Sequence, residues 1–168
     1  DKPSVEGWAS YWHLYAMEAD GSGLRKLTEG PFQDYDADCL PEGGVAFHIT
    51  RSKVRFLCWR PQAYVLHRME ADGSAMRRLS HANLSEWKPS VMQSGRILWT
   101  RSEYLDKGAD FGHTLWSIHP DGTHPELVFG NNTPNCYSQA HEVPGTEEIV
   151  CTLMSHGDHQ GPIALIDR

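Results

Sequence analysis

The sequence predicts an all-β fold built from repeated four-stranded units, and three observations support this prediction. A turn motif, Met-Glu-Ala-Asp-Gly-Ser, begins at Met17 and again at Met69, and a weaker copy, Ile-His-Pro-Asp-Gly-Thr, begins at Ile118. Between the copies lies a second recurring pattern, in which a short strand, a glycine-containing turn and a strongly apolar strand follow one another. Helical periodicity is absent over any useful length. Because repeats of this kind determine the architecture, they take precedence over any single residue.

Each copy of the Asp-Gly motif is predicted to form a β-hairpin. The Asp-Gly pairs begin at Asp20, Asp72 and Asp121, which gives repeat intervals of 52 and 49 residues. Apolar and aromatic residues alternate before each pair, and Asp and Gly tolerate the positive φ of tight hairpin turns. A catalytic group is needed once, whereas a turn is needed in every repeat. We therefore expect the three aspartates to cap their own turns through side-chain to backbone hydrogen bonds.

The second pattern predicts another hairpin in each repeat. Its apolar strands contain Val45–Phe47, Ile97–Trp99 and Ile149–Cys151, and the third residue of each should lie at the same level of the core between sheets. Two hairpins in about fifty residues give four strands, which is the size of one β-propeller blade.

The whole chain, residues 1–168, is predicted to be one incomplete β-propeller domain. Its repeats span about 12–35, 36–86, 87–136 and 137–168, which corresponds to about three to three and a half blades. A propeller typically has about four to eight blades, so we expect part of a ring of about six or seven. Because free edge strands pair with other β-structure, the expected partner is the remainder of a parent propeller or a second copy of the chain.

Composition narrows the possible partners. The net charge is −7 and the pI is about 5.8. Nucleic acids and anionic membranes need a basic surface, so neither is an expected partner. No apolar run approaches the roughly eighteen residues that cross a bilayer, so no membrane span is predicted.

The four cysteines give no metal or haem signature. Cys39, Cys58, Cys136 and Cys151 form no Cys-x-x-Cys and no Cys-x-x-Cys-His sequence, which leaves a zinc ribbon and a covalent haem unsupported. Disulfides within a blade stay open, as Cys39 with Cys58 and as Cys136 with Cys151. Cys151 also fits a buried apolar position, because it aligns with Trp99.

The repeat motif, in the form Tyr-x-Met-Glu-Ala-Asp-Gly-Ser-x-x-Arg-x-Leu, resembles the TolB-type, WD40-like β-propeller repeat. From about Trp12 to Asp167 the chain also resembles the propeller group of the hydrazine synthase alpha subunit middle domain. This resemblance implies an exported bacterial protein, periplasmic or extracellular. In that group the redox chemistry is on haems in other domains, and fold does not fix function, so hydrazine chemistry is not carried over to this chain.

Polar residues that do not repeat, at positions that do, are the best candidates for a ligand site. Aligning the first hairpins gives two sets of equivalent positions, Asp36, Lys88 and Gln139, and then Asp38, Ser90 and His141. The first strand of each blade lines the central channel of a propeller, so we expect these positions to face the channel and Gln139 to contact a ligand or partner.

Two metal sites are possible on this pattern. The spacing of Asp34, Asp36 and Asp38 would place three carboxylates on one face of a strand, which suits calcium; the alternative is a solvated channel entrance. His141, with His156 and His159, is compatible with a transition metal, and the alternative is a set of surface loop histidines.

The histidine-rich region faintly resembles the metal-dependent oligogalacturonate lyases, which are propeller enzymes, but the spacing around Gln139 and His141 departs from that family.

In the insert between residues 51 and 62, Arg55, Trp59 and Arg60 combine basic and aromatic groups that can stack on a ligand or partner; the alternative is a hairpin packed on another domain. The common catalytic signatures are absent.

The sequence therefore predicts an interaction or ligand-display module of a larger exported bacterial protein, with other proteins as partners and no catalysis of its own. The alternatives are a metal-dependent propeller enzyme, a lyase or a hydrolase, and the propeller part of a haem-containing redox subunit. The pattern demands no cofactor, and calcium or a transition metal are the candidates.

Overall fold

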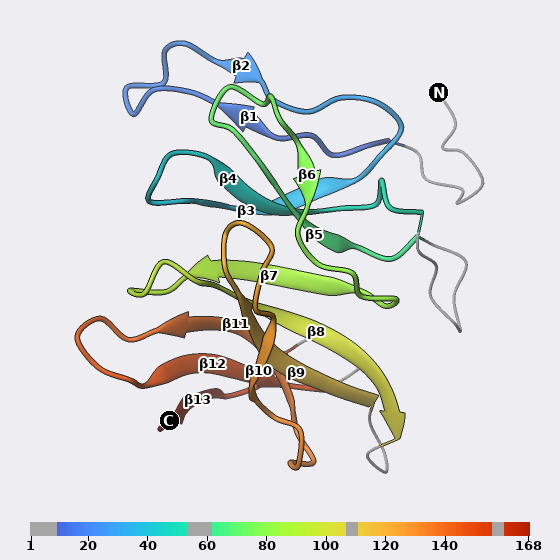
Figure 1. The fold of residues 1–168 in the computed structure, drawn as a ribbon, viewed down its shortest axis with the longest axis vertical. Helices are drawn as coiled ribbons and strands as arrows, with labels where there is room; N and C mark the ends of the chain where they lie inside the picture. The colour runs from blue at the N-terminus through green and yellow to red at the C-terminus, as the bar shows by residue number, and fades with distance from the viewer. Residues whose placement is uncertain (1–9, 54–61, 107–110, 156–159) are drawn as a thin grey trace.

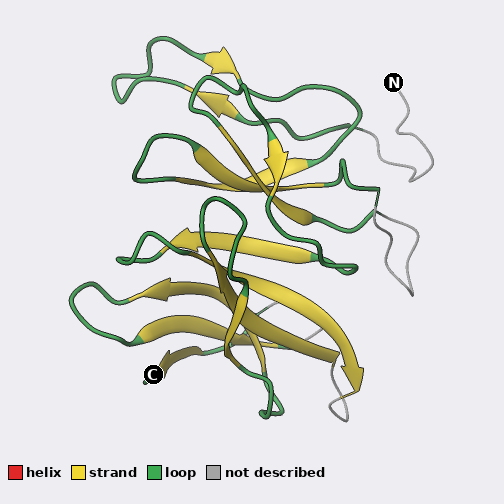
Figure 2. Cartoon of the chain, in the orientation of Figure 1, coloured by secondary structure: helices red, strands yellow, loops and turns green. Residues whose placement is uncertain are grey.

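The computed structural model describes residues 10–53, 62–106, 111–155 and 160–168, and this part of the chain consists of strands and loops without a helix (Figure 1; Figure 2). The predicted all-β class is confirmed. The strands are β1 (Tyr15–Ala16), β2 (Arg25–Lys26), β3 (Asp34–Cys39), β4 (Val45–Ile49), β5 (Val65–Met69), β6 (Arg77–Arg78), β7 (Glu86–Val91), β8 (Ile97–Asp106), β9 (Phe111–Ile118), β10 (Glu126–Phe129), β11 (Cys136–Glu142), β12 (Ile149–Met154) and β13 (Ile163–Ile166).

The strands form four antiparallel sheets, whose first strands β1, β3, β7 and β11 follow one another from the top to the bottom of Figure 1. Their orders are β1-β2, β3-β4-β5-β6, β7-β8-β9-β10 and β11-β12-β13. The first strands of the last three sheets begin at Asp34, Glu86 and Cys136, one or two residues before the repeat boundaries predicted from the sequence. Within the described ranges, no helix is long and apolar enough to cross a membrane.

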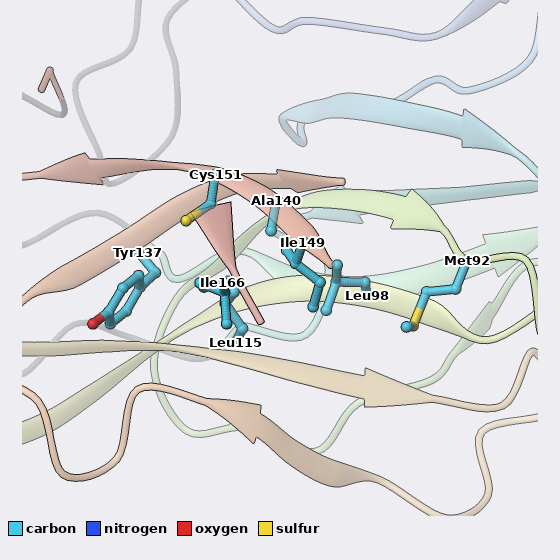
Figure 3. Close-up of a cluster of buried hydrophobic side chains, with 8 residues drawn as sticks. All are labelled: Met92, Leu98, Leu115, Tyr137, Ala140, Ile149, Cys151 and Ile166. Carbon is cyan, nitrogen blue, oxygen red and sulfur yellow. The ribbon is translucent and has the colours of Figure 1, made fainter. Parts of the chain in front are cut away.

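The core lies between successive sheets and follows the predicted register. Phe47, Trp99 and Cys151 pair with the third strand of their sheets at equivalent rungs, and their exposed fractions are 0%, 1% and 3%. Their placement at one level is confirmed. Figure 3 shows the cluster between the last two sheets, where Leu98 and Leu115 pack near Ile149, Cys151 and neighbouring side chains.

The Asp-Gly turns are built as the sequence predicts, with one difference. In each turn the aspartate Oδ1 accepts a hydrogen bond from the backbone N–H two residues later, at 2.9, 2.8 and 2.8 Å. The glycines Gly21, Gly73 and Gly122 have φ of 84°, 89° and 89°, whereas none of the three aspartates has positive φ. Glycine alone therefore supplies the left-handed conformation, and aspartate supplies the cap.

The second and third of these turns also pack against the preceding sheet. A Cβ on Gly73 would lie 2.7 Å from the Leu27 carbonyl oxygen. Arg68 and Arg77 both donate to the Pro120 carbonyl oxygen in the next sheet's turn, at 3.2 and 3.3 Å. These two turns therefore close their own hairpins and also contact the neighbouring sheet.

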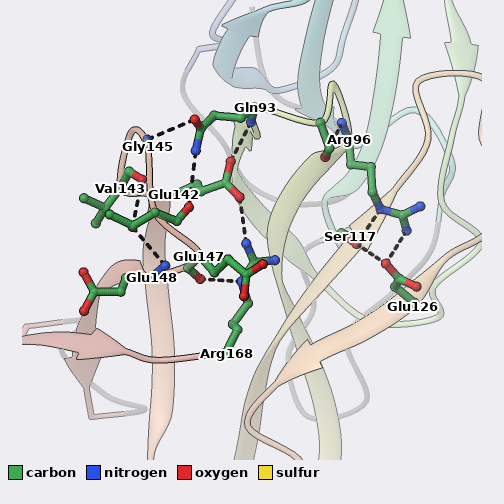
Figure 4. A network of polar contacts seen from close by, with 12 residues as sticks. Gln93, Arg96, Ser117, Glu126, Glu142, Val143, Gly145, Glu147, Glu148 and Arg168 are labelled. Carbon is green, nitrogen blue, oxygen red and sulfur yellow. Dashed lines mark hydrogen bonds and ion pairs between the residues drawn. The ribbon is translucent and has the colours of Figure 1, made fainter.

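The inner hairpin turns provide a second connection between sheets, as Figure 4 shows. Gln93, in the turn after β7, donates its backbone N–H to Glu142 Oε2 at 2.5 Å and accepts from the Gly145 N–H at 3.0 Å. Arg168 pairs with the other oxygen of Glu142 at 2.7 Å. The last two sheets are therefore joined at their inner hairpin turns, whereas the Asp-Gly turns contact the sheets that precede them.

We expect Gly73→Val to lower the free energy of unfolding by at least about 2 kcal/mol, because valine at positive φ is strained and its Cβ would collide with a backbone carbonyl. Gly95→Val is the matched control, since Gly95 has φ 80° with open space around its Cβ position, and it should cost less. Asp72→Ala, which removes only an exposed cap, should also cost less. Chemical denaturation measures all three, and equal losses for the two glycine variants would contradict the packing role.

Candidate functional site

The first strands of the last three sheets carry a β-bulge at the same place. The pairing register shifts between Tyr35 and Asp38 in β3, and the same shift recurs in β7 and β11. Within the bulges, Asp36, Lys88 and Gln139 have φ of 53°, 55° and 53°. A left-handed conformation is uncommon for residues other than glycine. Its recurrence at three equivalent positions therefore indicates a regular feature of the blade and not an accident of one strand.

The three bulges surround one hollow. Its volume is about 300 Å³, and β3 packs on β7 while β7 packs on β11. The lining residues are Asp36, Ala37, Lys88, Pro89, Gln139 and His141. The structure thus brings together four of the polar positions that the sequence alignment selected.

An ion pair closes one side of the hollow. Lys88 Nζ lies 2.6 Å from Asp36 Oδ1, and the Lys88 backbone N–H donates to Asp36 Oδ2 at 3.3 Å. Both carboxylate oxygens are therefore engaged. The Lys88 side chain is 42% exposed, so its ammonium group still has donor capacity toward the hollow.

Gln139 and His141 complete the polar lining. Both are exposed, and neither side chain has a hydrogen-bond partner within the part of the chain that the structure describes. The side chains of Lys88, Gln139 and His141 can therefore all offer N–H donors to a ligand in the hollow.

Asp38 and Ser90, at the aligned positions next to this hollow, bind the backbone of adjacent strands. Asp38 accepts from the N–H groups of Cys39 and Val91, both at 2.9 Å, and Ser90 Oγ donates to the Ala140 carbonyl at 2.7 Å. These contacts join β3 to β7 and β7 to β11. Asp38 and Ser90 thus stabilise the packing of the first strands.

The predicted row of three carboxylates is wrong in its geometry. The bulge at Asp36 interrupts the alternation of β3, and Asp34 is buried with its Oδ2 3.2 Å from His13 Nδ1. Burial raises the pKa of Asp34, with opposing hydrogen bonds from Thr28 and His13. Across the described ranges, no group of three or more His, Cys, Asp or Glu side chains is placed to hold a metal ion.

Several predicted site residues lie outside the described residues, namely Arg55, Trp59, Arg60, His156 and His159. Their roles in binding a partner, ligand or metal stay predictions. Cys58 also lies there. Cys39 and Cys151 have free thiols, so Cys151 forms no disulfide with Cys136, and burial raises the pKa of the Cys151 thiol.

A second hollow was missed from the sequence. It has a volume of about 350 Å³ and is lined by Trp12, Gln33, Tyr35 and Tyr64. The rings of Tyr35 and Tyr64 meet edge to face, with centroids 4.5 Å apart. Trp12 and Tyr64 are one 52-residue period apart, so an alignment of aromatic positions would have shown that they are equivalent, but not that they share a hollow.

Comparison with known proteins identifies the architecture. No family model and no curated protein sequence matches the chain. In structure it is similar to hydrazine synthase of Kuenenia stuttgartiensis, with a TM-score of 0.75 and 19% identity over 92% of this chain and 28% of that chain. It is also similar to puromycin hydrolase, with a TM-score of 0.54 and 17% identity over 83% of this chain and 20% of that chain.

The chain thus spans under a third of either solved structure, and at these identities the likeness shows the fold alone. The fold is a β-propeller, and its four sheets are blades or parts of blades.

Proposed function

We propose that this chain is a non-catalytic propeller module that displays a ligand site at its channel, in the hollow lined by Asp36, Lys88, Gln139 and His141. One observation carries the proposal. The β-bulge with its left-handed residue repeats in three blades, while the residue at that position changes from Asp36 to Lys88 to Gln139. The Asp-Gly turn, which serves folding, keeps its residues in every copy. If the bulge served only folding, we would expect the same residue in every copy of the bulge, as in the turn.

Backbone strain supports the same interpretation. A non-glycine residue in the left-handed region costs on the order of 1 kcal/mol or more, and such residues concentrate at binding and active sites. Lys88 and Gln139 gain no turn hydrogen bond from their side chains that would offset this cost. Their conformation aims two long polar side chains at a shared hollow.

The chemistry of the hollow favours a ligand rich in hydrogen-bond acceptors. Asp36 is neutralised by Lys88, whereas Lys88, Gln139 and His141 have donors to offer. Carboxylates form charge-assisted hydrogen bonds with such donors. A small dicarboxylate or tricarboxylate, or an acidic side chain of a partner protein, therefore fits best.

Calorimetric titration with succinate and citrate tests this proposal, with succinamide as the uncharged control. We expect the carboxylates to bind and Gln139→Ala or His141→Ala to weaken binding at least about fivefold, because each removes one donor. His124→Ala, which removes an exposed histidine of the β9–β10 turn, should leave binding unchanged. Absence of carboxylate binding, or binding that neither hollow variant weakens, would overturn the proposal.

The alternative is a metal-dependent enzyme, since His141 is exposed in the hollow and a hydrolase shares the fold. Metal analysis of the purified chain separates the two functions. Stoichiometric zinc, manganese or iron that is lost in His141→Ala would favour the enzyme. Calcium as the only bound metal would be compatible with the non-catalytic module.

We also propose that the module works next to further blades, in a periplasmic or extracellular protein, as the resemblance of its repeats implies. Met17 is 66% and Ile163 is 79% exposed, yet the equivalent rungs of an inner blade hold Met69 and Leu66, both 0% exposed. A further blade, from the rest of a parent protein or a second copy, would cover these side chains. Light scattering that shows a stable monomer would contradict this.

A further inference from the structure

The aromatic hollow lined by Trp12, Gln33, Tyr35 and Tyr64 is separate from the polar hollow and has a different chemistry. Three of its four lining side chains are aromatic, and its volume of about 350 Å³ suits a small ligand group. None of the four is charged at neutral pH. A ligand would therefore be recognised mainly by ring faces and edges.

Trp12 is presented to solvent on a fixed backbone. Its N–H donates to Gln33 Oε1 at 2.9 Å, and its carbonyl accepts from the Asp34 N–H at 3.0 Å. Its exposed fraction is nevertheless 69%. Because the backbone of Trp12 is fixed, only its side-chain torsions remain to be ordered when a ligand binds.

The polar capacity of this hollow is small. Gln33 is buried, and both ends of its amide are occupied, since Oε1 binds Trp12 and Nε2 donates to the Ser10 carbonyl at 2.9 Å. The Tyr35 and Tyr64 rings contact each other. Ligands that need many hydrogen bonds, such as sugars, are therefore poorly matched to this lining.

The local electrostatic field favours a positive ligand. Burial raises the pKa of Tyr35 well above its usual value and that of Tyr64 to about 12, so both phenols are neutral. The Asp36 carboxylate adds to both shifts, and Asp36 directly follows Tyr35 in β3, so its negative charge lies near this hollow. Lys88 offsets part of that charge from the side of the polar hollow, and among the residues that the structure describes no cation lines the aromatic one.

We propose that this hollow binds a methylated ammonium group, held over the rings of Trp12, Tyr35 and Tyr64 by cation–π attraction. Such ions are weakly hydrated and need no hydrogen-bond acceptor, and aromatic cages recognise them in other proteins. The ligand class is a quaternary or trimethylated amine, free or on a larger molecule.

NMR titration with choline tests the proposal, with 3,3-dimethyl-1-butanol, its uncharged isostere, as the matched ligand. We expect choline to bind with a Kd on the order of 1 mM and the isostere at least about fivefold more weakly. Equal binding of the two compounds would show an apolar hollow only and would overturn the proposal.

Substitutions locate the site. Trp12→Leu should weaken choline binding about tenfold because it keeps apolar bulk and removes the ring, while Trp12→Phe should keep most of it. Tyr15→Leu, at another exposed aromatic residue of the same hairpin, should have no effect. Choline binding that Trp12→Leu leaves unchanged would place the cation elsewhere. If Trp12→Leu fails to fold, the comparison of choline with its uncharged isostere on the unaltered chain still tests whether the hollow prefers a cation.

The two hollows can be tested independently. His141→Ala should leave choline binding unchanged, so failure of the carboxylate titration and failure of the choline titration are distinguishable.

Discussion

Trp99→Ala is expected to lower the free energy of unfolding by about 3 to 5 kcal/mol, the cost of removing a large aromatic side chain from a packed core. Trp99 is 1% exposed and packs among Leu66, Ile97 and Ile118, between the two four-stranded blades. Its indole N–H donates to Glu86 Oε1 at 2.9 Å, and the substitution removes this bond as well. Denaturant unfolding followed by far-ultraviolet circular dichroism measures the loss.

Trp116 provides the matched control for Trp99. It occupies the paired rung on β9 but is only partly buried, with the Arg101 guanidinium 4.6 Å from its ring centroid. Trp116→Ala should therefore cost clearly less, about 1 to 2 kcal/mol. A loss below about 1 kcal/mol for Trp99→Ala would contradict the register of β8.

Glu86→Ala is expected to cost about 3 kcal/mol, because it leaves buried donors without an acceptor. Glu86 is 0% exposed and lies where two blades meet. Its carboxylate accepts from Ser80 Oγ at 2.5 Å, from the Leu66 N–H at 3.0 Å and from the Trp99 indole. A loss no greater than that of an exposed glutamate, with Glu18→Ala as the control, would show that these bonds contribute little.

The pH dependence of stability tests the same group. Burial raises the pKa of Glu86, while its hydrogen bonds from Ser80, Leu66 and Trp99 oppose the shift. The folded state therefore holds this proton more tightly than the unfolded state, and the stability that the proton confers is lost as pH rises through the folded pKa. The stability difference between the unaltered chain and Glu86→Gln should be larger near pH 4.5 than at pH 7. A difference that does not change with pH would contradict the raised pKa.

The architecture was predictable because its signals are local and repeated. An Asp-Gly turn needs only a few residues to form, so its copies identify the outer hairpins without knowledge of any long-range contact. The second strands follow from apolar runs, and the interval of 52 residues places Phe47 and Trp99 at equivalent rungs. Their burial and pairing in the structure agree with this alignment.

The site was predictable only in part. The alignment identified Asp36, Lys88 and Gln139 as equivalent, because equivalence depends on spacing alone. It did not predict the bulge, since an extra residue shifts the alternation by one position and these mostly polar strands have too few apolar residues to show the shift. The carboxylate row in β3 was wrong for this reason. The aromatic hollow was not predicted, because repeat spacing does not show that Trp12 lies beside Tyr35 and Tyr64 of the next blade.

The docking of each Asp-Gly turn on the preceding blade has a consequence for how such proteins evolve. Gly73 contacts Leu27 in one pair of blades, and in the next pair Gly122 lies 3.5 Å from the Leu79 carbonyl oxygen, measured from the position of a Cβ. The two four-stranded blades thus each have a turn that packs on the preceding blade, beside the residue that follows its outer strand. Duplicating or deleting one unit of about fifty residues joins surfaces that already match. Gene duplication can therefore change the number of blades without inventing a new interface, while the side chains on the bulges diverge independently.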